Sequence, residues 1–471
     1  MSALGPPGGE TTTYRFGPRD PHGLVMGLRT GQVLVIAASL GIGVALVRAL
    51  GGPIGSFGLL CSVVAGVALS LLPVAGRTAE QWAPVLARYA AGRIAGGAGS
   101  AIAARGALGR TSSRADARGR APRLFRGFGV TSLEIEGQHL GAVHDRRAGT
   151  LTVVLAVEGP AFSLLGELDR ERRVAAWSDV LAAAAHDARA LYRLQWVERT
   201  LPDACDLLAR PLGAGIADHR SVLAYAELCE ATGAGLLRHD VLLACTLRES
   251  VSSSTLRSEL RGLVRHLREA GLLVDGPLSG AGLRMVLRES FEVKPLRHAV
   301  SWPWPIALRE RWSEVVVDGL VHATYWVAEW PRVDVRSDFL LPILAGLDGR
   351  RTVSVVMAPV PPERAQRRAE HARTARVADD QLRVRHGFAL TARRRREQEA
   401  VERREQELAF GHVGFRFSGY VSVAAPDAVQ LAESCGRLEQ AAALARLDLR
   451  RLYGAQAEAL LTCLPLGRGC R

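Results

Sequence analysis

The sequence predicts an α+β protein made of an N-terminal transmembrane helical hairpin followed by a large cytoplasmic body. Residues 33–50 and 54–75 are almost entirely apolar, and only the short turn 51–53 separates them. Strand-like and helix-like segments then alternate over most of the remaining chain. A bilayer core is about 30 Å thick and takes roughly 20 apolar residues in a helix. Each apolar stretch has about that length, so the pair predicts two membrane spans.

An alternative for the two stretches is a signal peptide followed by a buried helix. A secretory apolar region is only about 7–15 residues long, whereas the first stretch here is longer and begins beyond residue 30. Arginines, Arg29 among them, lie outside both ends of the hairpin, while the turn has only Arg48 beside it. Because basic flanks stay in the cytoplasm, we expect a multi-pass protein of the cytoplasmic cell membrane with both termini cytoplasmic.

The segments on either side of the hairpin are predicted to be a tail, an interfacial helix and a linker. Residues 1–30 are rich in Gly, Pro and Thr and are expected to form a mobile cytoplasmic tail. Residues 77–95 have apolar positions at helical spacing, which predicts an amphipathic helix on the membrane surface. We expect Arg29, Trp82, Arg88 and Arg93 at this membrane interface; the alternative is a short helix packed on the soluble body. Residues 96–125 predict a flexible basic linker.

The body is predicted to contain a first α+β domain at 126–300 and a second at 301–471. In the first, we expect strands at 131–135, 141–144, 150–157, 191–199 and 240–247, and helices at 168–187, 216–232, 255–270 and 280–291. Because strand–helix–strand occurs twice there, the pattern favours a ferredoxin-like (split βαβ) arrangement. In the second, we expect strands at 322–330, 352–360, 415–424 and 447–452, and helices at 339–344, 428–445 and near the C-terminus.

A long charged helical arm is predicted at 361–410. Its arginines alternate with glutamates at i,i+4 spacing, which supports a solvent-exposed helix. A nucleic-acid surface is the alternative, but the local charge is nearly balanced, so a solvated helical hairpin is favoured. The candidate docking residues on this arm are Arg393, Arg394, Arg395, Arg396, Arg403 and Arg404.

Composition and missing motifs argue against catalysis. The formal net charge is +13, and all but one of the 60 basic residues are arginine, a bias typical of a GC-rich, actinobacterial genome. A phosphate-binding P-loop needs a lysine after a glycine-rich turn, whereas the single lysine, Lys294, has no glycine near it. The seven cysteines form no C-x-x-C pair, which is typical of reduced apolar positions. We expect no catalytic residue, no cofactor and no metal site.

The chain resembles components of type IV secretion and conjugation systems. The tail TYRFGPRD, the tight hairpin and the TAEQW that follows resemble the PrgI-like two-span inner-membrane subunit. The stretches VVVDGLVHATYWVAEWPR, DFLLPIL, RTVSVVMAPVPPERA and FRFSGYVSV resemble the N-terminal, non-ATPase domain of the CagE/TrbE/VirB family of conjugative ATPases. The TTTYRFGPRD opening and LPLGRG ending also resemble actinobacterial proteins that fuse these two parts beside a conjugation-like ATPase.

The resemblance implies a non-catalytic, membrane-anchored scaffold of a type IV secretion-like or conjugation-like machine. Its expected partners are the lipid bilayer, a conjugation-like P-loop ATPase supplied in trans and further copies of the chain. A second hypothesis is a membrane-tethered protein that holds transferred DNA through its arginines. Nucleic acid is therefore a possible partner, but the balanced charge of the arm does not favour it. A third is a degenerate enzyme, which the lack of a P-loop lysine disfavours.

Overall fold

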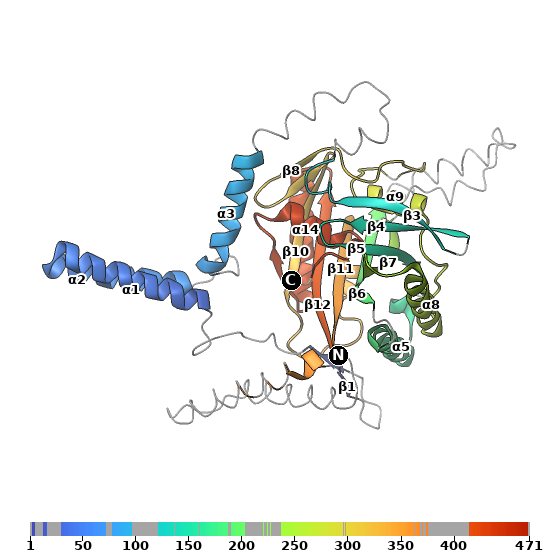
Figure 1. Ribbon diagram of the computed structural model, residues 1–471, viewed down its shortest axis with the longest axis horizontal. Helices are drawn as coiled ribbons and strands as arrows, with labels where there is room; N and C mark the ends of the chain where they lie inside the picture. The colour runs from blue at the N-terminus through green and yellow to red at the C-terminus, as the bar shows by residue number, and fades with distance from the viewer. Residues whose placement is uncertain are drawn as a thin grey trace, which may run out of the picture.

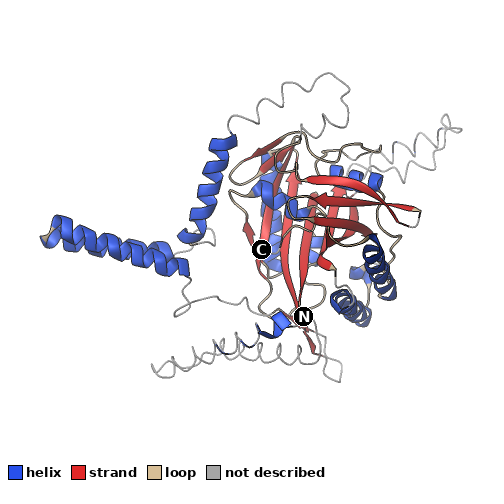
Figure 2. Cartoon of the chain, in the orientation of Figure 1, coloured by secondary structure: helices blue, strands red, loops and turns tan. Residues whose placement is uncertain are grey.

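A computed structural model describes most of the hairpin and of the body. The described residues are 2–4, 13–16, 30–71, 78–96, 121–135, 137–159, 161–186, 190–202, 237–294, 298–361, 363–367 and 414–469, with single residues 220, 224, 227, 296, 370 and 374. Figure 1 shows a long helical hairpin and a separate helix beside a large body, and Figure 2 shows that the body is a sheet with helices on it.

The N-terminal region contains three long helices. A small strand pair, β1 (Ser2–Leu4) and β2 (Thr13–Arg15), precedes helices α1 (Thr30–Leu50) and α2 (Gly52–Leu71). Gly51 and Gly52 have φ of 59° and 54°, a region that favours glycine, and this allows the reversal between the two helices. Helix α3 (Ala79–Gly96) follows and contains Pro84.

The body is built on one continuous antiparallel sheet of 11 strands. Its order is β3-β4-β5-β7-β6-β11-β12-β10-β9-β8, and β13 also pairs with β10. The strands are β3 (Phe128–Ile135), β4 (Gln138–Asp145), β5 (Thr150–Val157), β6 (Leu191–Pro202), β7 (Leu237–Arg248), β8 (Leu308–Glu310), β9 (Val315–Val317), β10 (Leu320–Glu329), β11 (Arg350–Val360), β12 (Gly414–Ala425) and β13 (Asp448–Arg451).

The two halves of this sheet repeat one strand order. In the first half β7 lies between β5 and β6. The segment that follows α8 then pairs beside β5 through two isolated β-bridges, Glu158↔Leu273 and Leu155↔Pro277. In the second half β12 lies between β10 and β11, and β13 returns to β10. The two halves meet where β6 of the first pairs with β11 of the second, over Arg351↔Thr200 to Met357↔Leu194. The body therefore has an approximate internal repeat joined at β6 and β11.

Helices cover both faces of the sheet. One face carries η1 (Phe162–Leu164), α5 (Glu167–His186), α8 (Ser253–Glu269), α10 (Leu341–Leu344) and α13 (Ala428–Leu444), and the other carries α9 (Gly280–Glu289) and α14 (Gln456–Cys463). Local sequence explains these helices. In α8, Leu256, Leu260, Leu263 and Leu267 recur on one side and are buried, and Ser252 caps the helix by accepting a hydrogen bond from the Thr255 N–H.

The C-terminal segment connects the two halves on the α9/α14 face. After α14, Leu464 and Leu466 are buried in the same core as α9 and β7. The Gln195 side chain donates to the carbonyls of Thr462 and Leu464 and accepts from the Gly467 N–H at 2.7 Å. Gly467 has φ of 64°, and a Cβ at this position would collide with Thr246. Close backbone approach therefore requires glycine here.

The α+β class and the two apolar helices agree with the sequence-based prediction. The ferredoxin-like description stays a prediction, as does the division into 126–300 and 301–471, whose strands pair in one sheet. Strands β8 and β9 were not expected. All of the expected helix at 216–232 except residues 220, 224 and 227 lies outside the described residues, as do most of the arm at 361–410 and residues 97–120 of the linker.

Candidate membrane-anchor and docking sites

Helices α1 and α2 pack through small residues and expose their apolar side chains. Their apolar segments, Gly31–Leu50 and Gly52–Leu71, have mean hydropathies of 2.3 and 2.1 and are long and apolar enough to cross a membrane. Ser62 Oγ donates to the Ser39 carbonyl at 3.0 Å, and a Cβ at Gly66 would collide with Ser39. Small residues at such an interface let helix backbones approach closely in lipid.

Helix α3 is attached to the body by an aromatic cluster. The Trp82 ring stacks on Trp312 with centroids 5.6 Å apart and lies 6.1 Å from Tyr453, and the Tyr89 ring meets Trp312 edge-on at 5.1 Å. Arg88 forms a 3.0 Å ion pair with Glu458 at the start of α14. We call these contacts the α3 junction. Burial also raises the pKa of nearby Glu310, which accepts a hydrogen bond from the Ala457 N–H.

The α3 junction bears directly on two residues that the sequence placed at the membrane interface. Trp82 and Arg88 contact the body, which matches the alternative of a helix packed on the soluble part. The amphipathic pattern identified the side of α3 that makes contacts but not what it contacts. Arg93 lies near the end of α3, and Arg29 lies outside the described residues. A role for these four residues at the lipid surface stays a prediction.

The N-terminal tail also docks on the body. The Tyr14 N–H donates to the Val335 carbonyl at 2.8 Å, and the Val335 N–H donates back to Tyr14 at 3.0 Å. Tyr14 is only 4% exposed, and the Phe16 ring stacks on Trp330 at 5.2 Å and meets Phe339 at 5.4 Å. The expectation of a mobile tail therefore needs correction at residues 13–16, because strand pairing and ring contacts hold them.

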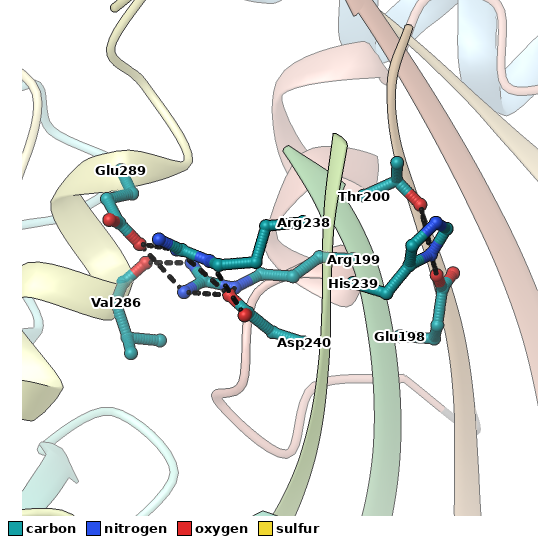
Figure 3. A network of polar contacts seen from close by, with 8 residues as sticks. All are labelled: Glu198, Arg199, Thr200, Arg238, His239, Asp240, Val286 and Glu289. Atoms are coloured by element: carbon teal, nitrogen blue, oxygen red, sulfur yellow. Dashed lines mark hydrogen bonds and ion pairs between the residues drawn. The ribbon is translucent and has the colours of Figure 1, made fainter. Parts of the chain in front are cut away.

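A buried charged network lies at one end of the sheet, beside the joint between the halves (Figure 3). Arg199 donates to Asp240 at 2.9 Å, to Glu289 at 2.8 Å and to the Val286 carbonyl at 2.7 Å. Arg238 binds the same two carboxylates at 2.9 and 3.0 Å. The two arginines thus occupy both carboxylates and tie β6 and β7 to α9.

The opposite face of the same strand ends carries a second polar cluster. His239 Nδ1 lies 3.0 Å from Glu198 Oε1 and 3.1 Å from Thr200 Oγ1, as Figure 3 shows. Arg351 is 2% exposed and lies 3.9 Å from Glu198. Arg351 also donates to the Leu344 and Leu347 carbonyls, which fixes the loop before β11. These contacts connect the ends of β6, β7 and β11.

The candidate docking arginines of the arm cannot be placed. Arg393, Arg394, Arg395, Arg396, Arg403 and Arg404 all lie outside the described residues. Within the described part of the chain, no group of three or more His, Cys, Asp or Glu side chains could hold a metal ion. Cys245, Cys435 and Cys463 are free and buried there, and burial raises the pKa of Cys245 and Cys463 to about 12.

Sequence reasoning missed the partners of the tail and of α3. Trp312 and Tyr453 come from loops beside β9 and β13, far from α3 in sequence, and no local periodicity marks them. It also missed the charged network, because its carboxylates and guanidiniums come from three separate elements. One feature of the sequence could have revealed the charged network. Charged residues occur within the otherwise apolar strands β6 and β7.

Comparison with known proteins supplies one family match. Residues 244–327 match the protein-family model of EccE, described as a putative type VII ESX secretion system translocon. The matched stretch runs from the end of β7 to most of β10. The search of curated proteins found no match. Because the matched family is of type VII, the resemblance to type IV systems is not supported. The match and the two apolar helices together support a membrane protein of a secretion system.

Proposed function

We propose that this chain is a non-catalytic, membrane-anchored scaffold subunit of a type VII-like secretion translocon. The observation that carries the proposal is the attachment of both flanks of the hairpin to one body. Residues 13–16 dock beside Trp330, and α3 docks beside Trp312. An anchor held at two points keeps the body at a defined position near the bilayer, which is what an assembly platform requires.

The double attachment also supports the membrane topology that we propose. A hairpin that crosses the bilayer twice returns to the side on which it started, so both docked flanks and the body share one side. The arginines outside the spans place that side in the cytoplasm. Cysteines introduced at Gly51 or Gly52 should react with an impermeant thiol reagent added outside the cell, whereas a cysteine at Thr78 should not. Labelling of both positions from outside would contradict this topology.

We further propose that the body recruits a separate P-loop ATPase and further copies of the chain. The arm that joins β11 to β12 is the candidate docking element. Val360 pairs with Gly414 at its base, and a Cβ at Gly414 would lie 3.6 Å from the Ala365 Cβ. The two ends are therefore adjacent, and residues 365–409 can be replaced by a short Gly/Ser linker without straining the sheet.

The recruitment test compares full-length protein with this deletion variant in affinity purification from membranes. We expect the deletion to abolish co-purification of the ATPase and of neighbouring copies, and we expect the intact association to weaken with salt. The matched control replaces Arg393, Arg394, Arg395 and Arg396 by lysine, which keeps the charge. Full recovery of the assembly by the deletion variant would assign docking to the α+β body instead.

The non-catalytic character is tested separately. The full-length protein in detergent should neither hydrolyse ATP nor bind it at micromolar concentration. Saturable binding that is lost on Lys294→Ala would reveal a nucleotide site and refute this part of the proposal.

A further inference from the structure

A small polar pocket lies where the two halves of the sheet meet α9 and α14. About 20 Å³ of it can take the centre of a water molecule, and the pocket opens to solvent. Ser290 after α9, His322 of β10, Arg350 of β11 and Ser422 of β12 contribute polar side chains, and Leu460 and Leu464 contribute apolar walls. None of the described lining residues is acidic. We call it the Arg350 pocket.

Arg350 is a half-buried cation without a carboxylate of its own. Its Nη1 donates to the Glu289 backbone carbonyl at 2.7 Å. The carboxylates that act on it electrostatically are Glu289, which is already bound by Arg199 and Arg238, and Glu292, which is bound by Arg288. Burial and the charge of Arg199 lower the pKa of Arg350 to about 10, although Glu289 and Glu292 act in the opposite direction. A buried cation without a paired anion is costly, so an anion in the pocket would stabilise this arrangement.

His322 supplies a second polar group that lacks a partner. Its side chain is 4% exposed, and its Nε2 has no hydrogen-bond partner among the described residues. Burial and the charge of Arg350 lower its pKa to about 3, so the imidazole is neutral and can donate one hydrogen bond. The Ser290 and Ser422 side chains also line the pocket. The Ser422 hydroxyl accepts a hydrogen bond from Thr324 and keeps its own proton to donate, and the Ser290 hydroxyl makes only a long 3.4 Å hydrogen bond to the Val286 carbonyl. The pocket is thus lined by hydroxyl, imidazole and guanidinium hydrogen-bond donors and by no carboxylate among the described residues. Such a set of donors favours binding of an oxyanion.

We propose that the Arg350 pocket binds a small tetrahedral oxyanion of the phosphate class. Arg350 supplies the charge, because guanidinium geometry matches oxyanions well, and Ser290, Ser422 and His322 supply the remaining hydrogen bonds. The pocket is small, so free phosphate is the expected source. Because Ser290 belongs to the first half of the body and the other donors to the second, the bound anion stabilises the joint between them. This inference is independent of the proposed scaffold role.

The test measures binding of inorganic phosphate to the full-length protein in detergent by thermal unfolding and by calorimetry. Phosphate is added at millimolar concentration, with chloride at matched ionic strength as the reference. The two test variants are Arg350→Gln, which removes the charge, and Ser422→Ala, which removes one hydroxyl. The control variant is Arg309→Gln, because Arg309 is an exposed arginine on the edge strand β8.

Phosphate should raise the unfolding temperature of the wild type and of Arg309→Gln to the same extent. Arg350→Gln should weaken phosphate binding by about ten- to a hundredfold and Ser422→Ala by roughly two- to tenfold. A parallel titration with glycerol 3-phosphate distinguishes the source, because tighter binding of the ester would assign the site to an organic phosphate. No phosphate-dependent shift in the wild type, or an equal shift in Arg350→Gln, would overturn the proposal.

Discussion

The α3 junction makes a prediction whose size follows from the ring geometry. Replacing Trp312 by alanine removes the contacts with Trp82 at 5.6 Å and with Tyr89 at 5.1 Å, two of the three aromatic pairs that cross the junction. Such pairs contribute about 0.5–1.5 kcal/mol each, so docking of α3 should weaken by roughly 1–3 kcal/mol. That loss corresponds to about a 5- to 150-fold shift toward an undocked helix.

Hydrogen exchange of full-length protein in lipid nanodiscs measures this shift. The α3 amides of Trp312→Ala should exchange faster by about that factor, while amides of the central strands β6 and β11 stay protected. The matched control is Leu86→Ala, because Leu86 is on the same helix and is 51% exposed. If Leu86→Ala accelerates exchange and Trp312→Ala does not, then lipid rather than the body holds α3, and our reasoning is refuted.

Three further predictions concern the hairpin, the charged network and the C-terminal segment. Gly66→Leu should separate α1 from α2, because the added side chain collides with Ser39; reduced retention in membrane fractions checks this, and unchanged retention contradicts it. Glu289→Ala should lower the free energy of unfolding, measured with denaturant, by about 3–5 kcal/mol, because it leaves buried Arg199 without one of its carboxylates. A decrease of less than about 1 kcal/mol would mean that water solvates the network. Gly467→Ala should lower the unfolding temperature, since it is strained at φ of 64° and collides with Thr246, whereas the control Gly436→Ala, inside α13 with open space at its Cβ, should raise it slightly.

The sequence by itself determined the features that depend on local periodicity. Unbroken apolar runs of span length predicted α1 and α2, and the Leu256, Leu260, Leu263 and Leu267 stripe predicted α8. Alternating apolar and polar residues predicted β6 and β12, and strands were also expected at the positions of β5, β7, β10 and β11. These signals are local because a helix or strand must place its apolar side chains on one face within a few residues. The sequence also singled out Trp82 and Arg88, but as membrane-interface residues rather than as contacts of the body.

Only the tertiary structure decided what those faces meet. The pairing of β6 with β11, the docking of Tyr14 against Val335 and the stacking of Trp82 on Trp312 all join residues more than 150 positions apart. No periodicity within a segment encodes such pairings, because their free energy comes from burial shared between distant elements. The Arg350 pocket arises in the same way, since its groups meet only after the two halves have joined into one sheet. The charged network forms within the first half, when β6, β7 and α9 come together.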